Sequence, residues 1–542
     1  MKTKSFISFA VCVAVSVLMC SCSNEESADS NSNGQLTAFT GGIVTEAPME
    51  RMQLSSPEIS TEVPGFLTRT SMNRDAIGGH GAFLWEPKDV IYVEDDNGKL
   101  YKSQNAINDA VARTTFLVNG SYSTKGQYDV YYCGTNSGAG AKKVVIAGSQ
   151  TQSAFNNTKH FGAAGDCGVA KATKTTVSGK SGYRFDLEHK ASYLCFLPYM
   201  PIKVQRANFR IQRIEITSDN NISGTYELTH DGLSATGTNE SKTITLNVGT
   251  DGNGLKLADQ ATATKSIKNS LYVVIAPGTH ALKVKYTVSD AKNTVMTITK
   301  SYKSHNFGVN KICNIPVDLG VRHYSGHNYY MWDAAENYWS GHEWDSADPW
   351  QPTTDLGKNE GYPKSDDASR WYHEGEGPFD ASVNPLFKQL PNGNEMGWYI
   401  LKGDGHRDNS TWWEVFGELH TGGLWLKKLS VIAQENGKGL ADLKLKDPKG
   451  NDLRAPSNNN YYSIPSKNGK PADSEIGKYF FLPALGNYRE GWFYDFGSSG
   501  YYWSSSTDYS YNGAHAMLFD GGNVYLYYDN VRDWGFVAQP FE

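Results

Sequence analysis

Strict alternation of hydrophobic and polar residues marks several segments between residues 36 and 320. Residues 281–288 alternate without a break, and residues 242–248 follow the same pattern. A period of two residues is typical of half-buried β-strands, whereas windows with the helical period of 3.6 residues are scarce here. We therefore predict a mainly β fold with two β-sandwich subdomains in tandem, at residues 36–200 and 201–320.

The last 222 residues follow a different pattern, which is rich in aromatic side chains and poor in periodicity. They hold twelve of the 13 tryptophans. The clearest signal is a hairpin, with strands at residues 514–519 and 523–528 joined by a glycine turn. We predict an α+β domain at residues 391–542. Residues 321–390 are an aromatic-rich linking segment or the beginning of that domain.

The first 35 residues indicate export. Lys2 and Lys4 precede an apolar run of 14 residues, too short to span a bilayer comfortably. The end of the run resembles a bacterial lipobox, which implies that residues 1–22 are a lipoprotein signal peptide and that Cys22 is acylated, as with palmitate. The alternative is an ordinary secretory signal. Residues 23–35 form an acidic tether that resembles the surface-export signal of Bacteroidales lipoproteins, so we expect a surface-exposed lipoprotein of the cell outer membrane.

Five short motifs follow one another between residues 67 and 319. They lie at residues 67–71, 83–93, 187–191, 274–278 and 302–319. In this order, behind a lipobox, they resemble the fimbrillin family, the Mfa-like and FimA-like subunits of Bacteroidales pili. One departure is Lys88, where the family usually has glycine.

The fimbrillin resemblance implies assembly by strand exchange. A trypsin-like protease cuts after an arginine, the first strand leaves, and a strand of another fimbrial subunit fills the groove by β-strand addition. Here the departing strand would lie around residues 36–39. The arginine would be Arg69, with Arg51 and Arg74 as alternatives. Residues 321–542 would obstruct donation of a C-terminal strand, which favours the tip position.

The C-terminal region contains motifs of its own. Residues 481–484 read F-L-P-A, residues 502–505 read Y-W-S-S, and residues 535–537 read G-F-V. With the hairpin, this order resembles the C-type-lectin-like fold of the Fibrobacter major paralogous type. The region has no cysteine and no E-P-N, Q-P-D or W-N-D triplet, so calcium-dependent sugar binding has no support. Residues 410–414 have capping-box-like spacing and predict the start of a helix.

Net charge and motifs limit the ligands and reactions that we expect of this protein. The formal net charge of −6 gives no reason to expect nucleic acid. No zinc-protease, P-loop, dinucleotide or G-x-S-x-G motif occurs, so we expect a non-catalytic protein without a cofactor. Two clusters of potential metal ligands are weak, and we expect no metal. They are Asp404, His406 and Asp408, and His342, Glu343, Asp345 and Asp348.

Four cysteines lie beyond the export segment. They are Cys133, Cys167, Cys195 and Cys313. They allow up to two disulfides, and the pairing stays open. Cys195 stands in an apolar run, which favours a buried thiol.

Aromatic residues crowd the predicted hairpin and its lead-in, and we take some of them as candidate ligand contacts. They are Tyr501, Tyr502, Trp503, Tyr525 and Tyr527. The alternative is that most of them fill a loop-rich core. We therefore expect a fimbrial tip adhesin that binds a glycan or a surface protein. The rival hypothesis is a monomeric, surface glycan-binding lipoprotein that does not polymerise.

Overall fold

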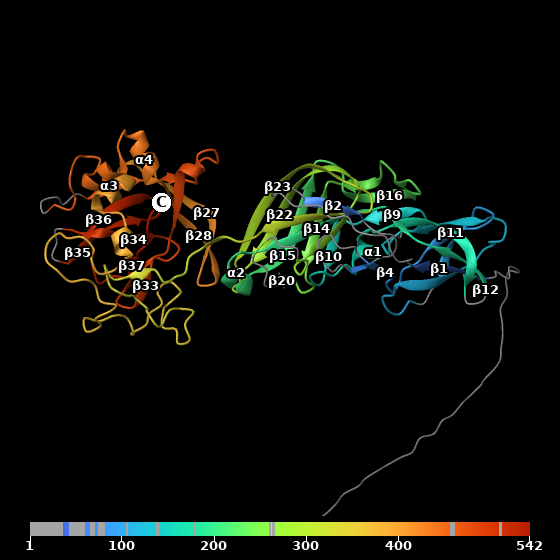
Figure 1. Cartoon of the computed structure of the whole chain (residues 1–542), viewed down its shortest axis with the longest axis horizontal. Helices are drawn as coiled ribbons and strands as arrows, with labels where there is room; N and C mark the ends of the chain where they lie inside the picture. The colour runs from blue at the N-terminus through green and yellow to red at the C-terminus, as the bar shows by residue number, and fades with distance from the viewer. Residues whose placement is uncertain are drawn as a thin grey trace, which may run out of the picture.

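The structure is a computed structural model. It describes residues 36–42, 60–64, 71–73, 82–104, 107–136, 140–177, 180–258, 262, 266–455, 461–508 and 512–542. Three units rich in β-structure lie end to end, with the C-terminal unit at the far end from the N-terminal one (Figure 1). The predicted mainly β fold is confirmed. Within the described ranges, no helix combines the length and hydrophobicity needed to cross a bilayer.

The first unit is an eight-stranded sheet in which seven strands form a closed ring. Hydrogen bonding runs from β12 through β1, β7, β6, β5, β8 and β11 and returns to β12, and β13 adds to β11. The strands are β1 (Thr37–Gly42), β5 (Tyr92–Glu94), β6 (Leu100–Gln104), β7 (Arg113–Val118), β8 (Gln127–Tyr132), β11 (Gly168–Val177), β12 (Lys180–Phe185) and β13 (Glu188–His189). A separate pair is formed by β3 (Ser71–Asn73) and β4 (Ala82–Leu84). We call the seven strands the N-terminal ring.

The second unit contains three sheets. One follows the order β10 (Ser149–Gln152), β19 (Thr243–Val248), β15 (Arg210–Ser218), β22 (Gly278–Ser289) and β23 (Val295–Phe307), with β20 (Leu255–Lys256) on β15. Another follows β2 (Ser60–Pro64), β24 (Lys311–Asp318), β14 (Ser192–Tyr199) and β21 (Leu271–Ile275). The third contains β9 (Lys143–Ile146), β16 (Ser223–Thr229), β17 (Gly232–Leu233) and β18 (Thr238–Ser241). Two short helices, α1 (Phe161–Ala164) and α2 (Lys203–Asn208), complete it.

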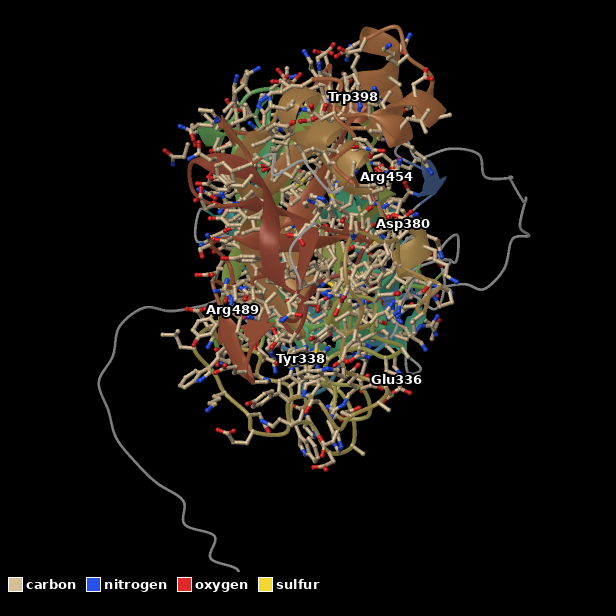
Figure 2. All side chains as sticks on the ribbon, turned by 90° about the vertical axis from the view of Figure 1, so that its left-hand side faces the viewer. Glu336, Tyr338, Asp380, Trp398, Arg454 and Arg489 are labelled. Atoms are coloured by element: carbon tan, nitrogen blue, oxygen red, sulfur yellow. The ribbon has the colours of Figure 1, made fainter. Side chains whose placement is uncertain are left out.

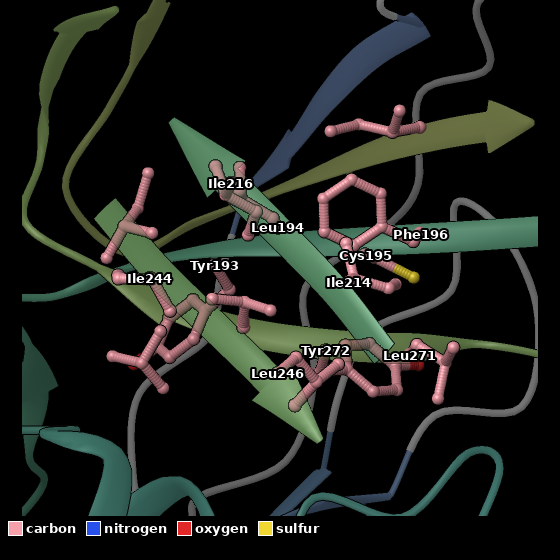
Figure 3. Packing of buried hydrophobic residues seen from close by; sticks show 14 of the residues in the cluster. Tyr193, Leu194, Cys195, Phe196, Ile214, Ile216, Ile244, Leu246, Leu271 and Tyr272 are labelled. Atoms are coloured by element: carbon pink, nitrogen blue, oxygen red, sulfur yellow. The ribbon is translucent and has the colours of Figure 1, made fainter. Parts of the chain in front are cut away.

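Strands are shared across the predicted boundary near residue 200. β2, β9, β10 and β14 precede that residue in sequence, yet all four pair within the second unit. Their side chains explain this, because the interior between the sheets is continuous and apolar. Figure 3 shows Leu194 and Cys195 of β14 packed near Ile214 of β15 and Tyr272 of β21. The simple division at 200 and 201 therefore does not describe the pairing.

The third unit contains two larger sheets. One follows β25 (Arg322–His323), β27 (His406–Val415), β28 (Glu418–Lys427) and β31 (Tyr479–Pro483), with β30 (Lys467–Asn468) on β27. The other follows β26 (Tyr329–Tyr330), β37 (Phe536–Val537), β34 (Gly500–Thr507), β35 (Gly513–Phe519), β36 (Asn523–Val531) and β29 (Tyr462–Pro465). β32 (Asn487–Arg489) pairs with β33 (Trp492–Tyr494). The helices are η1 (Phe387–Gln389), α3 (Gly393–Lys402), α4 (Leu429–Glu435), α5 (Leu440–Leu445) and η2 (Ile476–Lys478).

Residues 321–390 are part of the third unit. β25 is a strand of one of its two larger sheets and β26 is a strand of the other. Tyr329 and Trp339 are buried in the same core as Trp413. Of the two interpretations of this segment, the structure favours the beginning of the C-terminal fold over a separate linker. Large aromatic side chains here fill a core that few regular helices or strands cover.

The joint between the second and third units is packed. Leu419 of β28 belongs to the hydrophobic core of the second unit, and its backbone N–H donates to Asp290 Oδ2 at 2.9 Å. Lys292 Nζ lies 2.6 Å from Glu418 Oε1. Because a shared core and a buried hydrogen bond connect the two units, their relative position is fixed by packing as well as by the chain.

Candidate functional site

β1 is the strand that closes the N-terminal ring. It runs antiparallel to β7 over its whole length and parallel to β12, with Phe39 opposite Phe116 on one side and Tyr183 on the other. Both neighbours are distant in sequence. Removal of β1 would therefore leave a gap between β12 and β7 with unpaired backbone groups on two strand edges.

The side chains of β1 alternate between the interior of the ring and its surface. Phe39 is fully buried, and its ring lies 5.0 Å from that of Tyr122, edge to face, and 5.0 Å from that of Tyr183, stacked. Its neighbour Thr40 points outward, with its hydroxyl 2.9 Å from that of Thr115. Gly41 permits close packing, because an added Cβ would lie 2.8 Å from the ring of Phe185. Phe39 is thus the anchor of this strand.

The proposed processing residues lie outside the described residues. These are Cys22, Arg51, Arg69 and Arg74. The positions of the described strands nonetheless show which strands each cut would separate from the rest of the chain. A cut after Arg51 would separate β1 alone, whereas a cut after Arg69 or Arg74 would also separate β2, which pairs antiparallel with β24 of the second unit.

Three of the five predicted contact residues belong to the core. Tyr502 and Trp503 are fully buried and Tyr501 is 9% exposed, so the expectation that they present their rings to a ligand is not met. Tyr502 donates to the Pro483 carbonyl at 2.6 Å, and Trp503 Nε1 donates to the Tyr330 carbonyl at 2.8 Å. Such aromatic residues pack the interior and satisfy their polar atoms internally, which is the alternative interpretation.

Tyr525 and Tyr527 occupy the outer face of β36, as the alternation predicted. On the inner face, Val524 and Leu526 are buried, whereas Tyr527 is 39% exposed. The nearby Tyr461 is also exposed, and its ring lies 5.4 Å from that of Tyr527 and 6.2 Å from that of Tyr525. We call Tyr461, Tyr525 and Tyr527 the hairpin patch. Tyr461 could not be recognised as a member of the patch from the sequence, because it precedes β29, which pairs with β36 only in the folded chain.

One hydroxyl of the hairpin patch is held in place. The Tyr525 hydroxyl donates to Asp520 Oδ2 at 2.8 Å. Partial burial is the main cause that raises the pKa of Tyr525, and this hydrogen bond also raises it. Asp520 itself accepts from the backbone of Gly522 and Asn523 in the turn. The patch therefore presents three aromatic side chains, of which Tyr525 is anchored through its hydroxyl.

The two weak metal-ligand clusters are occupied by internal contacts. Asp404 pairs with Lys467 at 2.6 Å, and Asp408 accepts from Ser410 and Trp425. In the other cluster, His342 stacks on Trp350, and the Asp345 carboxylate lies 2.8 Å from His327 Nε2. Within the described part of the chain, no group of three or more His, Cys, Asp or Glu side chains is arranged to hold a metal ion.

The four cysteines are buried. Cys195 and Cys313 lie on the adjacent strands β14 and β24, and Cys133 and Cys167 lie at the ends of β8 and β11. Burial raises the pKa of Cys133 to about 11. Burial likewise raises the pKa of Cys167, so Cys133 and Cys167 are protonated at neutral pH and behave as small hydrophobic residues.

Comparison with known proteins gives remote structural similarities only. No family model matches the chain, and no curated protein matches it. A proposed cell adhesion protein from Bacteroides uniformis has 14% identity and a TM-score of 0.25, over 46% of this chain and 93% of its own. A second from Bacteroides thetaiotaomicron has 10% identity and a TM-score of 0.22, over 43% and 78%. A fimbrial protein from Bacteroides ovatus has 10% identity and a TM-score of 0.24, over 88% and 100%. Similarity at this level does not assign a function.

Proposed function

We propose that this protein is a non-catalytic, surface-exposed fimbrial subunit whose C-terminal unit is adhesive. Its assembly would be triggered by proteolysis after Arg69, Arg51 or Arg74, which releases β1 and opens the N-terminal ring. A strand of another subunit then takes the place of β1. Anchoring through acylated Cys22 would hold the precursor on the outer membrane before the cut.

The observation that carries the proposal is the position of β1. It is the first described strand, yet it lies between two strands from much later in the chain and seals the ring. After a cut at Arg51, β1 alone is separated, whereas a cut at Arg69 or Arg74 also requires β2 to leave β24. A replacement strand would recover the main-chain hydrogen bonds on both sides and would place one large apolar side chain where Phe39 lies.

The adhesive part of the proposal rests on the third unit. The hairpin patch is an exposed aromatic surface on a fixed scaffold, and aromatic side chains are favoured at binding surfaces. β24, the last long strand of the second unit, is paired with β2 and β14 and leads directly into β25. Donation of β24 to another subunit would pull apart the packed joint at Leu419, so a tip position is proposed.

The test is N-terminal sequencing on intact cells before and after mild trypsin treatment. A new terminus at Thr70 or Met52 is expected, and an Arg69→Gln variant distinguishes the two sites. The trimmed protein should then bind a synthetic peptide with the sequence of residues 36–42, and untrimmed protein should not. A matched peptide with Ala in place of Phe39 serves as the control.

Two outcomes would contradict the proposal. A chain that still begins at Cys22 and resists trypsin would favour the rival hypothesis of a monomeric glycan-binding lipoprotein. A trimmed chain that keeps β1 bound and takes up no peptide would show that cleavage does not open the ring.

A further inference from the structure

A pocket of about 290 Å³ lies on the third unit, among residues other than the hairpin patch. It is lined by residues from three separate segments of the chain: Met331, Tyr338, Tyr362, Pro363, Lys364, Ser365, Trp371, Glu490, Asp533 and Trp534. Figure 2 views this end of the molecule and labels Tyr338, which lines the pocket, and Arg489, which packs beside it. Four of the ten residues are aromatic.

Each segment of the pocket is fixed by local contacts. Arg370 pairs with Asp367 at 2.7 Å and donates to the carbonyls of Tyr338 and Gly361, which holds the loop that carries Tyr362 and Trp371. The walls are therefore preorganised, which reduces the entropy cost of binding.

The two acidic segments are turns. Glu490 stands at a φ of 47° in the tight turn between β32 and β33, and the backbone of the following Gly491 donates to the hydroxyl of Tyr338. Trp534 donates its backbone N–H to Val531 in the turn before β37. The guanidinium of Arg489 lies 4.1 Å from the centroid of the Trp534 ring and supports its position.

The carboxylate of Asp533 is incompletely satisfied. Its Oδ1 is buried and has no hydrogen-bond partner among the described residues. Burial, with a contribution from the nearby Glu490, raises the pKa of Asp533. Asp533 and Glu490 both line the pocket, so a bound ligand meets two carboxyl groups that can accept from its hydroxyl groups.

We infer that this pocket binds a single neutral pyranose residue of a glycan. Aromatic side chains contact the apolar C–H face of a sugar ring, and carboxylates accept from its hydroxyl groups. The volume of about 290 Å³ lies just below the range of about 300–1,000 Å³ for ligand pockets, which suits one ring rather than an extended peptide. This inference rests on the proposed adhesive role of the third unit and names its ligand class.

The charges at the pocket favour a neutral sugar over charged alternatives. Two carboxylates, Glu490 and Asp533, would repel an acidic sugar. An organic ammonium ion would meet Lys364, whose Nζ already lies 2.9 Å from the centroid of the Tyr362 ring. A neutral ring with several hydroxyl groups conflicts with neither sign of charge.

The test uses the full-length protein and the methyl glycosides of glucose, galactose, mannose and N-acetylglucosamine. Saturation-transfer difference NMR detects contact, and intrinsic tryptophan fluorescence gives the dissociation constant. At least one glycoside is expected to bind saturably. Asp533→Asn and Trp371→Ala should each weaken that binding by about tenfold or more. Leu445→Ala, at an exposed position on α5 outside both the pocket and the hairpin patch, is the control and should leave it unchanged.

Circular dichroism and the thermal unfolding temperature establish that each variant is folded. Failure of all four glycosides to bind would overturn the inference, as would binding that is unaltered in both pocket variants. Preferential binding of choline chloride would assign the pocket to ammonium ions instead. None of these measurements depends on cleavage or on strand exchange, so the sugar site and the fimbrial role can fail independently.

Discussion

Substitution of Phe39 by alanine should loosen β1 selectively. The Phe39 ring is fully buried between Tyr122 and Tyr183, so its removal leaves a cavity in the N-terminal ring. Truncation of a buried phenylalanine costs about 3–5 kcal/mol. β1 is held at one end of the described chain. If it detaches alone, that cost should raise the population of the opened state by roughly two to four orders of magnitude.

Hydrogen exchange measured by mass spectrometry reports this opening strand by strand. In Phe39→Ala, the amides of residues 37–42 should exchange much faster, and those of β7 and β12, the neighbours of β1, should follow. Amides of β22 in the second unit should be unchanged. Thr40→Ala is the matched control, because its hydroxyl contacts Thr115 at the exposed surface and its loss should cost little.

Two results would refute this reasoning. Unchanged exchange in residues 37–42 would mean that the strand is not anchored by Phe39. Equal acceleration in the N-terminal ring and in β22 would mean that the whole chain opens together, in which case β1 could not leave an otherwise folded subunit.

Three further predictions concern pH-dependent stability, the accessibility of a thiol and the joint between units. Burial lowers the pKa of His160 and of His515 to about 4, whereas the pKa of histidine in the unfolded chain is 6.5. Their contribution to stability is therefore complete above pH 6.5 and is lost as the pH falls toward 4. The free energy of unfolding from urea titrations should drop by about 1.4 kcal/mol per pH unit for each histidine in this window, and a flat profile would contradict this. After mild reduction, Cys133 should resist iodoacetamide at pH 8 until the protein is denatured, and alkylation in the native state, seen by mass, would show that it is accessible. Asp290→Ala removes the acceptor of the Leu419 N–H and should cost about 1–3 kcal/mol at the joint, with separate calorimetric transitions for the second and third units; a single unshifted transition would show that the joint does not depend on this bond.

Strands with strong periodicity could be predicted from the sequence, and the pairing between them could not. Residues 281–288 became β22, and the hairpin at residues 514–528 became β35 and β36. Alternation reports only which face of a strand is buried. It does not report the partner, so the insertion of β1 between β12 and β7 had no local signal.

The prediction that a helix begins at residues 410–414 is wrong. These residues belong to β27, which pairs with β28, and the capping-box spacing of Thr411 and Glu414 is coincidental. A capping box does form at the start of α3, where the side chains of Asn392 and Glu395 each accept from the other's backbone N–H. Residues 396–400 are apolar and continue the buried helix, whereas Trp412 and Trp413 serve opposite faces of a strand.

The candidate sites differ in what the sequence could reveal. Tyr525 and Tyr527 were recognised from alternation on one strand, whereas the pocket residues come from positions 331–371, 490 and 533–534. No linear pattern connects Asp533 with Trp371, because loops of the third unit bring them together. Burial of Tyr502 and Trp503 could not be predicted, because the sequence of a Y-W pair is the same whether its strand lies in the core or at the surface.

The two proposed activities lie in separate units. Phe39 belongs to the hydrophobic core of the first unit, whereas Asp533 and Trp371 belong to the third unit, and the second unit lies between them (Figure 1). Residues that share neither partners nor a core affect free energies additively. In the proposed assembly, force on a bound glycan would pass through the packed joint at Leu419 into the second unit before it reaches the strand that replaces β1. Under these two proposals, substitutions in the third unit would change ligand binding without altering strand exchange at the N-terminal ring.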